Sequence, residues 1–208
     1  MRRAAELLAR PADHLRVVTC HLGAGASLAA VRDGRSVDTT MGFTPLEGLV
    51  MATRSGSVDP GLLLWLLEYT GLSEREMAHA LEHESGMVAL AGTPDMRAAI
   101  SAAEAGDERA RLAFDVYVHR LRSGVATMAA AMNGLDALVF TGGVGEHAPE
   151  VRAAAAQGLG FLGVVVDEAA NSEARGDFDI TAPGTPVASL VVTAREDLEI
   201  ARQVRALL

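Results

Sequence analysis

Two glycine-rich segments contain the residues of this sequence that are best suited to hold an anion. Gly23-Ala24-Gly25 follows one apolar run, and Gly142-Gly143-Val144-Gly145 follows another, Leu138-Val139-Phe140. Glycine lacks a Cβ atom, so its backbone can approach a ligand closely and present successive N–H groups to it. Where a strand leads into a helix, unpaired N–H groups also favour phosphate.

Ordinary turns are the alternative interpretation of both segments. The second segment lacks the Walker lysine and does not complete the pattern G-x-G-x-x-G. Because both segments follow predicted strands, we expect Gly23–Gly25 and Gly143–Gly145 to lie at neighbouring strand ends and to share one phosphate-binding cleft.

A third pattern could bind a metal. Residues His79 to His83, "HALEH", fit H-x-x-E-H, a zinc-peptidase signature, and their two histidines would share one helix face. No other predicted helix supplies a convincing third ligand, and a five-residue pattern often arises by chance. We interpret these histidines as exposed positions of an amphipathic helix, with a zinc peptidase using His79, Glu82 and His83 as a remote alternative.

Charge and composition narrow the possible partners. The 208 residues carry a formal net charge of −9, half are hydrophobic, and Cys20 is the only cysteine. The negative charge argues against nucleic acid or an anionic membrane as the main partner. A single cysteine allows no disulfide framework, and no apolar run reaches membrane-spanning length. We expect a cytoplasmic protein.

An alternation of strands and helices must position these segments. Apolar runs predict strands at 15–20, 27–32, 35–39, 136–140, 164–166 and 187–192. Periodicity and capping residues predict helices at 2–10, 60–69, 73–81, 95–105, 107–132, after the second glycine segment, and at 196–207. Asp33-Gly34 indicates a hairpin. The polar, proline-bearing segment 176–186 is expected to be a loop. The pattern predicts one α/β unit, residues 1–208, with crossover helices.

Four segments, in order and spacing, resemble the second half of the acetate kinase family. They are "TCHLGAGAS", "SVDTTMGFTPLEGLVMATRSGSVDPGLL", "DMR" and "VFTGGVGEHAPEVR". The second is the most specific, and the resemblance covers essentially the whole chain. It implies a ribonuclease H-like lobe of the actin, Hsp70 and sugar-kinase superfamily, with a mixed sheet and flanking helices.

The resemblance also implies an activity, which is reversible phosphoryl transfer between ATP and acetate or another short-chain carboxylate, with Mg²⁺. Arg54 would stabilise the phosphoryl group in flight, because its planar fork of donors suits the equatorial oxygens. Glu196 would be the magnesium-associated carboxylate. A surface ion pair for Arg54 and a helix-dipole role for Glu196 are the alternatives. The resemblance also implies which residues contact the nucleotide, because their segments match the family's nucleotide-binding motifs. They are His21, Leu22, Gly23, Ala24, Gly25, Asp95, Met96, Arg97, Gly143, Val144, Gly145, Glu146 and His147.

Two residues and one whole lobe depart from the family pattern. Ala24 stands where members usually carry asparagine, and His147 stands where the usual motif reads "GEN". No segment matches the first lobe, so we expect an isolated C-terminal nucleotide-binding lobe with little activity of its own. A non-catalytic nucleotide-binding or oligomerisation fragment is the alternative.

Arg54 follows the apolar run 49–51 and is expected at the cleft, where a helix gives way to a loop. Family members dimerise through this lobe, and the apolar helices within 60–82 and 107–132 are consistent with a buried subunit surface. We expect a homodimer or a larger species.

Overall fold

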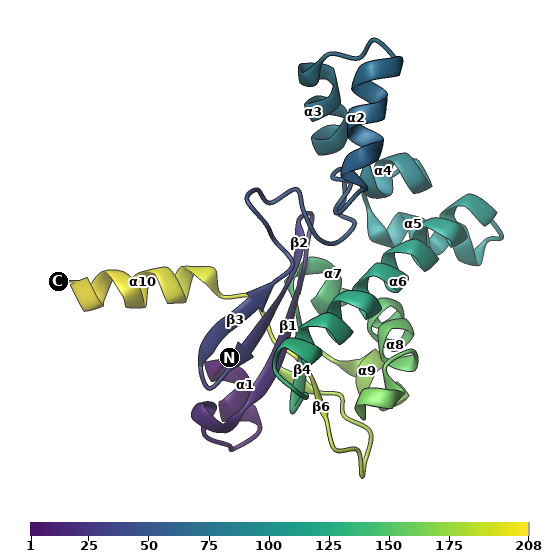
Figure 1. The fold of residues 1–208 in the computed structure, drawn as a ribbon. Coiled ribbons are helices and arrows are strands. Elements are labelled where there is room, and N and C mark those ends of the chain that lie inside the picture. The colour runs from purple at the N-terminus through teal and green to yellow at the C-terminus, as the bar shows by residue number, and fades with distance from the viewer. Residues whose placement is uncertain (208) are drawn as a thin grey trace.

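A six-stranded mixed sheet in the order β3-β2-β1-β4-β6-β5 organises the structure, a computed structural model that describes residues 1–207 (Figure 1). Strand β1 is parallel to β4, and β4 is parallel to β6, whereas β2, β3 and β5 pair antiparallel with their neighbours. The three parallel strands therefore end at the same edge of the sheet. The strands are β1 Arg16–Leu22, β2 Ala26–Arg32, β3 Arg35–Thr39, β4 Ala137–Thr141, β5 Phe178–Asp179 and β6 Ala188–Val191.

Helices flank both faces of the sheet. Helix α1 contributes Ala4 and Ala5 to a small core with Val17, Val139 and Leu190, whereas α6 and α8 pack on the opposite face (Figure 1). The helices are α1 Arg2–Leu7, α2 Pro60–Tyr69, α3 Glu74–His83, α4 Gly86–Ala91, α5 Met96–Glu104, α6 Glu108–Ala131, α7 Gly142–His147, α8 Pro149–Gln157, α9 Glu168–Glu173 and α10 Glu196–Leu207. This arrangement confirms the predicted mixed α/β fold.

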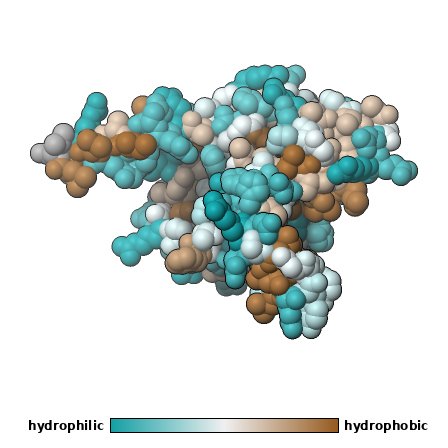
Figure 2. All heavy atoms as spheres, turned by 90° about the horizontal axis from the view of Figure 1, so that it is seen from above, coloured by the Kyte–Doolittle hydropathy of each residue, from teal (hydrophilic) through white to brown (hydrophobic). Residues whose placement is uncertain are grey.

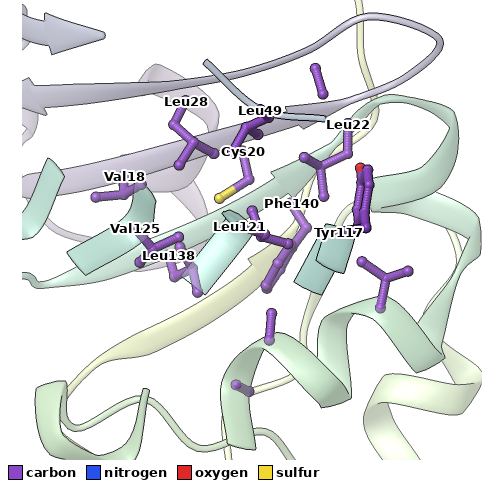
Figure 3. Close-up of a cluster of buried hydrophobic side chains, with 14 of the residues drawn as sticks. Val18, Cys20, Leu22, Leu28, Leu49, Tyr117, Leu121, Val125, Leu138 and Phe140 are labelled. Atoms are coloured by element: carbon purple, nitrogen blue, oxygen red, sulfur yellow. The ribbon is translucent and has the colours of Figure 1, made fainter. Parts of the chain in front are cut away.

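The main core lies between the sheet and α6. Leu121 and Val125 of α6 meet Cys20 of β1 and Phe140 of β4, and all four are fully buried (Figure 3). Successive residues of a strand point to opposite faces, so β1 supplies Val17 to one core and Cys20 to the other. Burial also raises the pKa of the Cys20 thiol, so the thiol stays protonated at neutral pH.

Two parts of the chain extend away from the sheet. Helices α2 and α3 form an arm beyond the β2 end of the molecule, and α10 projects sideways (Figure 1). No residue of α2 is buried, and α10 exposes Leu198, Ile200 and Val204. The projecting helix shows apolar surface along one side in Figure 2. Within residues 1–207, no helix combines the length and the hydropathy that a membrane span needs.

The structure corrects several predicted elements. The strand expected at 164–166 is reduced to two isolated bridges, from Val164 to Val187 and from Val166 to Thr181. The loop expected at 176–186 contains the short edge strand β5, and the first helix, expected to reach residue 10, ends at Leu7. Helices α4 and α9 have six residues each, too few for a periodic pattern to reveal. The second glycine segment is itself helical, as α7.

Candidate nucleotide pocket at the carboxyl edge of the sheet

A pocket of about 370 Å³ opens at the carboxyl edge of the parallel strands. Three segments form it: the turn between β1 and β2, the start of α5, and the exposed side of α7. Ligands of open α/β sheets bind at this edge. The lining residues are Gly23, Ala24, Pro94, Asp95, Met96, Arg97, Gly143, Val144, His147 and Ala148.

The pairing of β1 with β4 explains why two segments so distant in sequence meet. The strands are parallel and His21 lies opposite Thr141, so the chain leaves both strands at the same level. Gly23 and Gly143 both line the pocket. The expectation that the two glycine segments lie at neighbouring strand ends is confirmed, and nucleotide binding there stays a prediction.

The glycines of the second segment serve two different purposes. Gly142 has a φ of +79°, and a Cβ on it would stand 2.9 Å from the carbonyl oxygen of Leu22. A Cβ on Gly145 would stand 3.3 Å from the carbonyl carbon of Phe140. These two residues therefore allow α7 to pack closely on β1 and β4. Only Gly143 is exposed to the pocket, with no atom within 4 Å of an added Cβ.

The turn after β1 places its residues differently. The N–H of Gly23 donates to the carbonyl of Gly25 at 2.9 Å, and this leaves Ala24 exposed on the pocket wall. His21 is half-buried beneath the turn. Leu22 points into the main core, so only its backbone is available to a ligand (Figure 3).

The start of α5 brings a charged pair to the pocket. Asp95 caps the helix by accepting the N–H of Arg97 at 2.9 Å, and this bond holds the pKa of Asp95 below its usual value. The guanidinium of Arg97 lies 3.4 Å from the Asp95 carboxylate and is largely exposed. Met96, which is buried, completes this wall.

Arg54 lies in an irregular loop beside the turn, so the expected helix end is wrong. Residues 40–59 contain neither helix nor strand, and Leu49, Val50 and Met51 are buried in the main core as part of this loop. The Arg54 Nη1 atom stands 3.6 Å from the position of a Cβ on Gly25. Within residues 1–207, no carboxylate lies within 4.0 Å of its guanidinium. The alternative that Arg54 belongs to a surface ion pair is therefore not supported.

Backbone hydrogen bonds hold the Arg54 loop in place. The Ala52 N–H donates to the carbonyl of Ala24 at 3.0 Å, which joins the loop to the turn after β1. The Ser55 N–H donates to Leu81 at the end of α3, and the Met87 N–H of α4 donates to Met51. The Arg54 backbone is thus anchored to three neighbouring elements.

The two glutamates with predicted roles at the site, Glu146 and Glu196, lie in different places. The Oε1 atom of Glu146 accepts the N–H groups of Gly142 and Ala194, both at 2.9 Å, so it ties α7 to the segment between β6 and α10. Glu196 is exposed at the first position of α10, two residues beyond Ala194. It belongs to the same edge of the sheet, although it does not line the pocket.

The histidines of "HALEH" are exposed on α3, with ring centroids 4.9 Å apart. His79 faces Glu84, with 3.5 Å between Nε2 and the carboxylate. No group of three or more histidine, cysteine or acidic residues in the described part of the chain is arranged to hold a metal. The remote zinc alternative therefore lacks a third ligand there.

Arg152 is a buried residue that the sequence predictions missed. It lies in α8 behind the pocket wall and donates four hydrogen bonds to α7 and α9. Its only sequence signal is an arginine that precedes four alanines, at a position where the helix packs on the core.

Known proteins resemble this chain over nearly its whole length. The sequence profile of the acetokinase family matches residues 1–202. An acetate kinase from a Synechococcus species is 52% identical over 208 residues, which are 100% of this chain and 51% of that protein. An acetate kinase from Gloeobacter violaceus is 50% identical over 202 residues, 97% of this chain and 50% of its own length.

Solved structures give the same result. The crystal structure of Porphyromonas gingivalis acetate kinase superposes with a TM-score of 0.94 at 40% identity, covering 99% of this chain and 52% of that one. A propionate kinase from Francisella tularensis superposes with a TM-score of 0.89 at 38% identity, and the match covers 96% of this chain and 51% of that one. The chain spans about half the length of the curated relatives it matches.

Proposed function

The chain belongs to the acetokinase family, and from this premise we propose that it is the C-terminal, nucleotide-binding lobe of a carboxylate kinase. The reaction is reversible transfer of the γ-phosphoryl group of ATP to acetate or another short-chain carboxylate, which gives an acyl phosphate and ADP. The observation that supports it is the pocket where Gly23, Gly143 and Arg97 meet at the carboxyl edge of the sheet.

The residues present divide the work of phosphoryl transfer, which depends on positioning and charge neutralisation. The Gly23–Gly25 turn and the exposed face of α7 hold the nucleotide, and Arg97 supplies a cation at the pocket. Arg54, beside the turn, stabilises the negative charge on the transferring group. The carboxylate itself would be bound by the part of the protein that the relatives have in addition to this half.

Glu196 is the residue that we propose to hold Mg²⁺. Magnesium typically takes one or two carboxylates and completes its shell with phosphate oxygens and water, and its chemistry is neutralisation of the phosphate charge. An exposed carboxylate in the first turn of α10, at the carboxyl edge of the sheet, fits that pattern. Nucleotide titrations of wild type and Glu196→Gln, each with Mg²⁺ and with excess chelator, test this assignment. Wild type should lose affinity with the chelator and Glu196→Gln should not, whereas an equal loss in both would contradict it.

Gly143 offers a direct test of the pocket. We expect Gly143→Val to weaken MgADP binding at least about tenfold, because its side chain would occupy the space next to α7. Isothermal titration calorimetry of the chain measures the affinity. The Cβ of the new side chain meets no clash, since no atom lies within 4 Å of it, and the φ of Gly143 is not left-handed.

Gly160→Val is the matched control. Gly160 also has open space around an added Cβ, but it lies after α8, outside the pocket. Equal affinity of wild type and both variants would contradict the proposed pocket. A wild-type chain that binds no MgADP at millimolar concentration would contradict the proposed function as a whole.

The non-catalytic alternative, a nucleotide-binding or oligomerisation module, shares the pocket and differs in turnover. Acyl-phosphate formation by the chain joined to the first half of a relative distinguishes the two. Turnover there supports the kinase, whereas binding without turnover favours the module.

We also propose that the protein forms a homodimer through the arm of α2 and α3. The α2 residues Leu64, Trp65 and Tyr69 are each more than half exposed, and the rings of Trp65 and Tyr69 lie side by side, with centroids 5.7 Å apart. Exposed apolar side chains that gather in this way indicate a binding face. Light scattering should give twice the mass of one chain, and Trp65→Lys should give a single-chain mass. Phe161→Lys, at another exposed aromatic residue, should leave the mass unchanged. A wild-type monomer at micromolar concentration would contradict the proposal.

A further inference from the structure

Arg152 is the largest fully buried residue described in the structure, with 1% of its surface exposed. Its Nη1 atom donates to the carbonyl oxygens of Gly145 and Glu146, both at 2.9 Å. Its Nε and Nη2 atoms donate to the side-chain and backbone oxygens of Asn171, both at 2.7 Å. One guanidinium in α8 therefore joins the end of α7 to α9.

The end of α7 needs such a donor. The carbonyl of Gly145 would ordinarily accept the N–H of the residue four positions later, but that residue is Pro149, which has none. The N–H groups of Arg152 take its place, and Glu146, the next residue, is bonded in the same way. Asn171 supports the junction from the other side, since its Nδ2 donates to the Pro149 carbonyl at 2.9 Å.

Stability alone is a weak reason to place a guanidinium there. No carboxylate of the described chain lies within 4.0 Å of it, and desolvation lowers its pKa to about 10, so it stays charged at neutral pH. Burying an unpaired charge is costly, and an apolar side chain of similar volume often serves a core better. What the charge adds is a fixed geometry for two carbonyl groups of α7.

The pocket depends on that geometry. Gly143, Val144 and His147 line the pocket from the exposed side of α7, whereas Gly145 and Glu146 are bound by Arg152 from behind. We propose that Arg152 is a positioning residue for nucleotide binding, which holds α7 so that its exposed side keeps the shape of the pocket wall. This inference rests on the proposed nucleotide function of the pocket.

The test compares MgADP affinity with folding stability in substituted chains. Arg152→Met keeps the bulk of the side chain and removes its donors, and we expect at least about tenfold weaker binding. Arg152→Lys restores a charged donor without the fork and should recover part of the affinity. Asn171→Ala should weaken binding less than Arg152→Met, because the bonds to Gly145 and Glu146 remain.

Arg122→Met is the matched control. Arg122 also donates from its guanidinium to a backbone carbonyl of α8, that of Ala154, at 2.9 Å from Nε, but within residues 1–207 it donates no hydrogen bond to α7. The Arg122→Met substitution should lower the midpoint temperature of thermal unfolding without changing MgADP affinity. If Arg152→Met only lowers the thermal midpoint and binds MgADP like wild type, Arg152 is structural and the inference is wrong.

Amide hydrogen exchange separates this inference from the proposed function. In Arg152→Met, the amides of Val144 to Ala148 should exchange faster, whereas those of β4 should keep their protection. Unchanged exchange in α7 would overturn the inference even if wild type binds MgADP. If wild type binds no nucleotide, the proposed function fails and the nucleotide role of Arg152 fails with it.

Discussion

Replacement of Arg54 by alanine is expected to lower kcat for acyl-phosphate formation by about 10³-fold or more, by analogy with arginine fingers. The transferring phosphoryl group spreads its charge over equatorial oxygens, and a guanidinium fixed beside them stabilises the transition state more than either ground state. In the structure, Arg54 stands beside Gly25 with no carboxylate partner among residues 1–207. Its charge is therefore free for a ligand.

The measurement uses steady-state kinetics of a chimera in which the first half of the Synechococcus relative precedes this chain. The nucleotide KM should change far less than kcat, and Arg54→Lys should restore activity only partly, because an ammonium cannot reproduce the planar fork. Arg97→Ala is the comparison variant, since Arg97 lines the pocket and should affect mainly the nucleotide KM. A near-normal kcat in Arg54→Ala, or a rise in KM alone, would mean that Arg54 is not catalytic.

Gly86→Ala is expected to lower kcat by about 10²-fold without any change in the charge of the site. Gly86 has a φ of +63°, and an added Cβ would stand 2.2 Å from the carbonyl oxygen of Met51 and 2.6 Å from that of Arg54. Both contacts are with backbone atoms, so the loop must move. A displacement of roughly 1 Å can cost a reaction about this much when it misplaces a catalytic group.

Gly92→Ala separates displacement from backbone strain. Gly92 caps the same helix, α4, with a φ of +77°, but no atom lies within 4 Å of an added Cβ. Both variants should lose some stability in thermal unfolding, since alanine is strained at positive φ. Only Gly86→Ala should lose kcat in the chimera. Equal kcat values in the two variants would show that the loop position does not control Arg54.

Local chemistry allowed much of the fold to be predicted. Asp59 and Pro60 begin α2, and the capping box of Ser73 and Glu76 begins α3, as expected. Asp33-Gly34 forms the predicted hairpin. These features depend on neighbours within a few residues, so the sequence contains all the information they need.

The sequence by itself also identified the two glycine segments and the family, because residue types and spacing are local properties. Only the tertiary structure decided which groups face the pocket. The parallel pairing of β1 with β4 brings Gly23 and Gly143 together, whereas packing on the sheet turns Gly145 inward. Arg152 joins the site only through contacts with α7 and α9. Such roles follow from which surfaces meet across the sheet, and no pattern within a single segment records that.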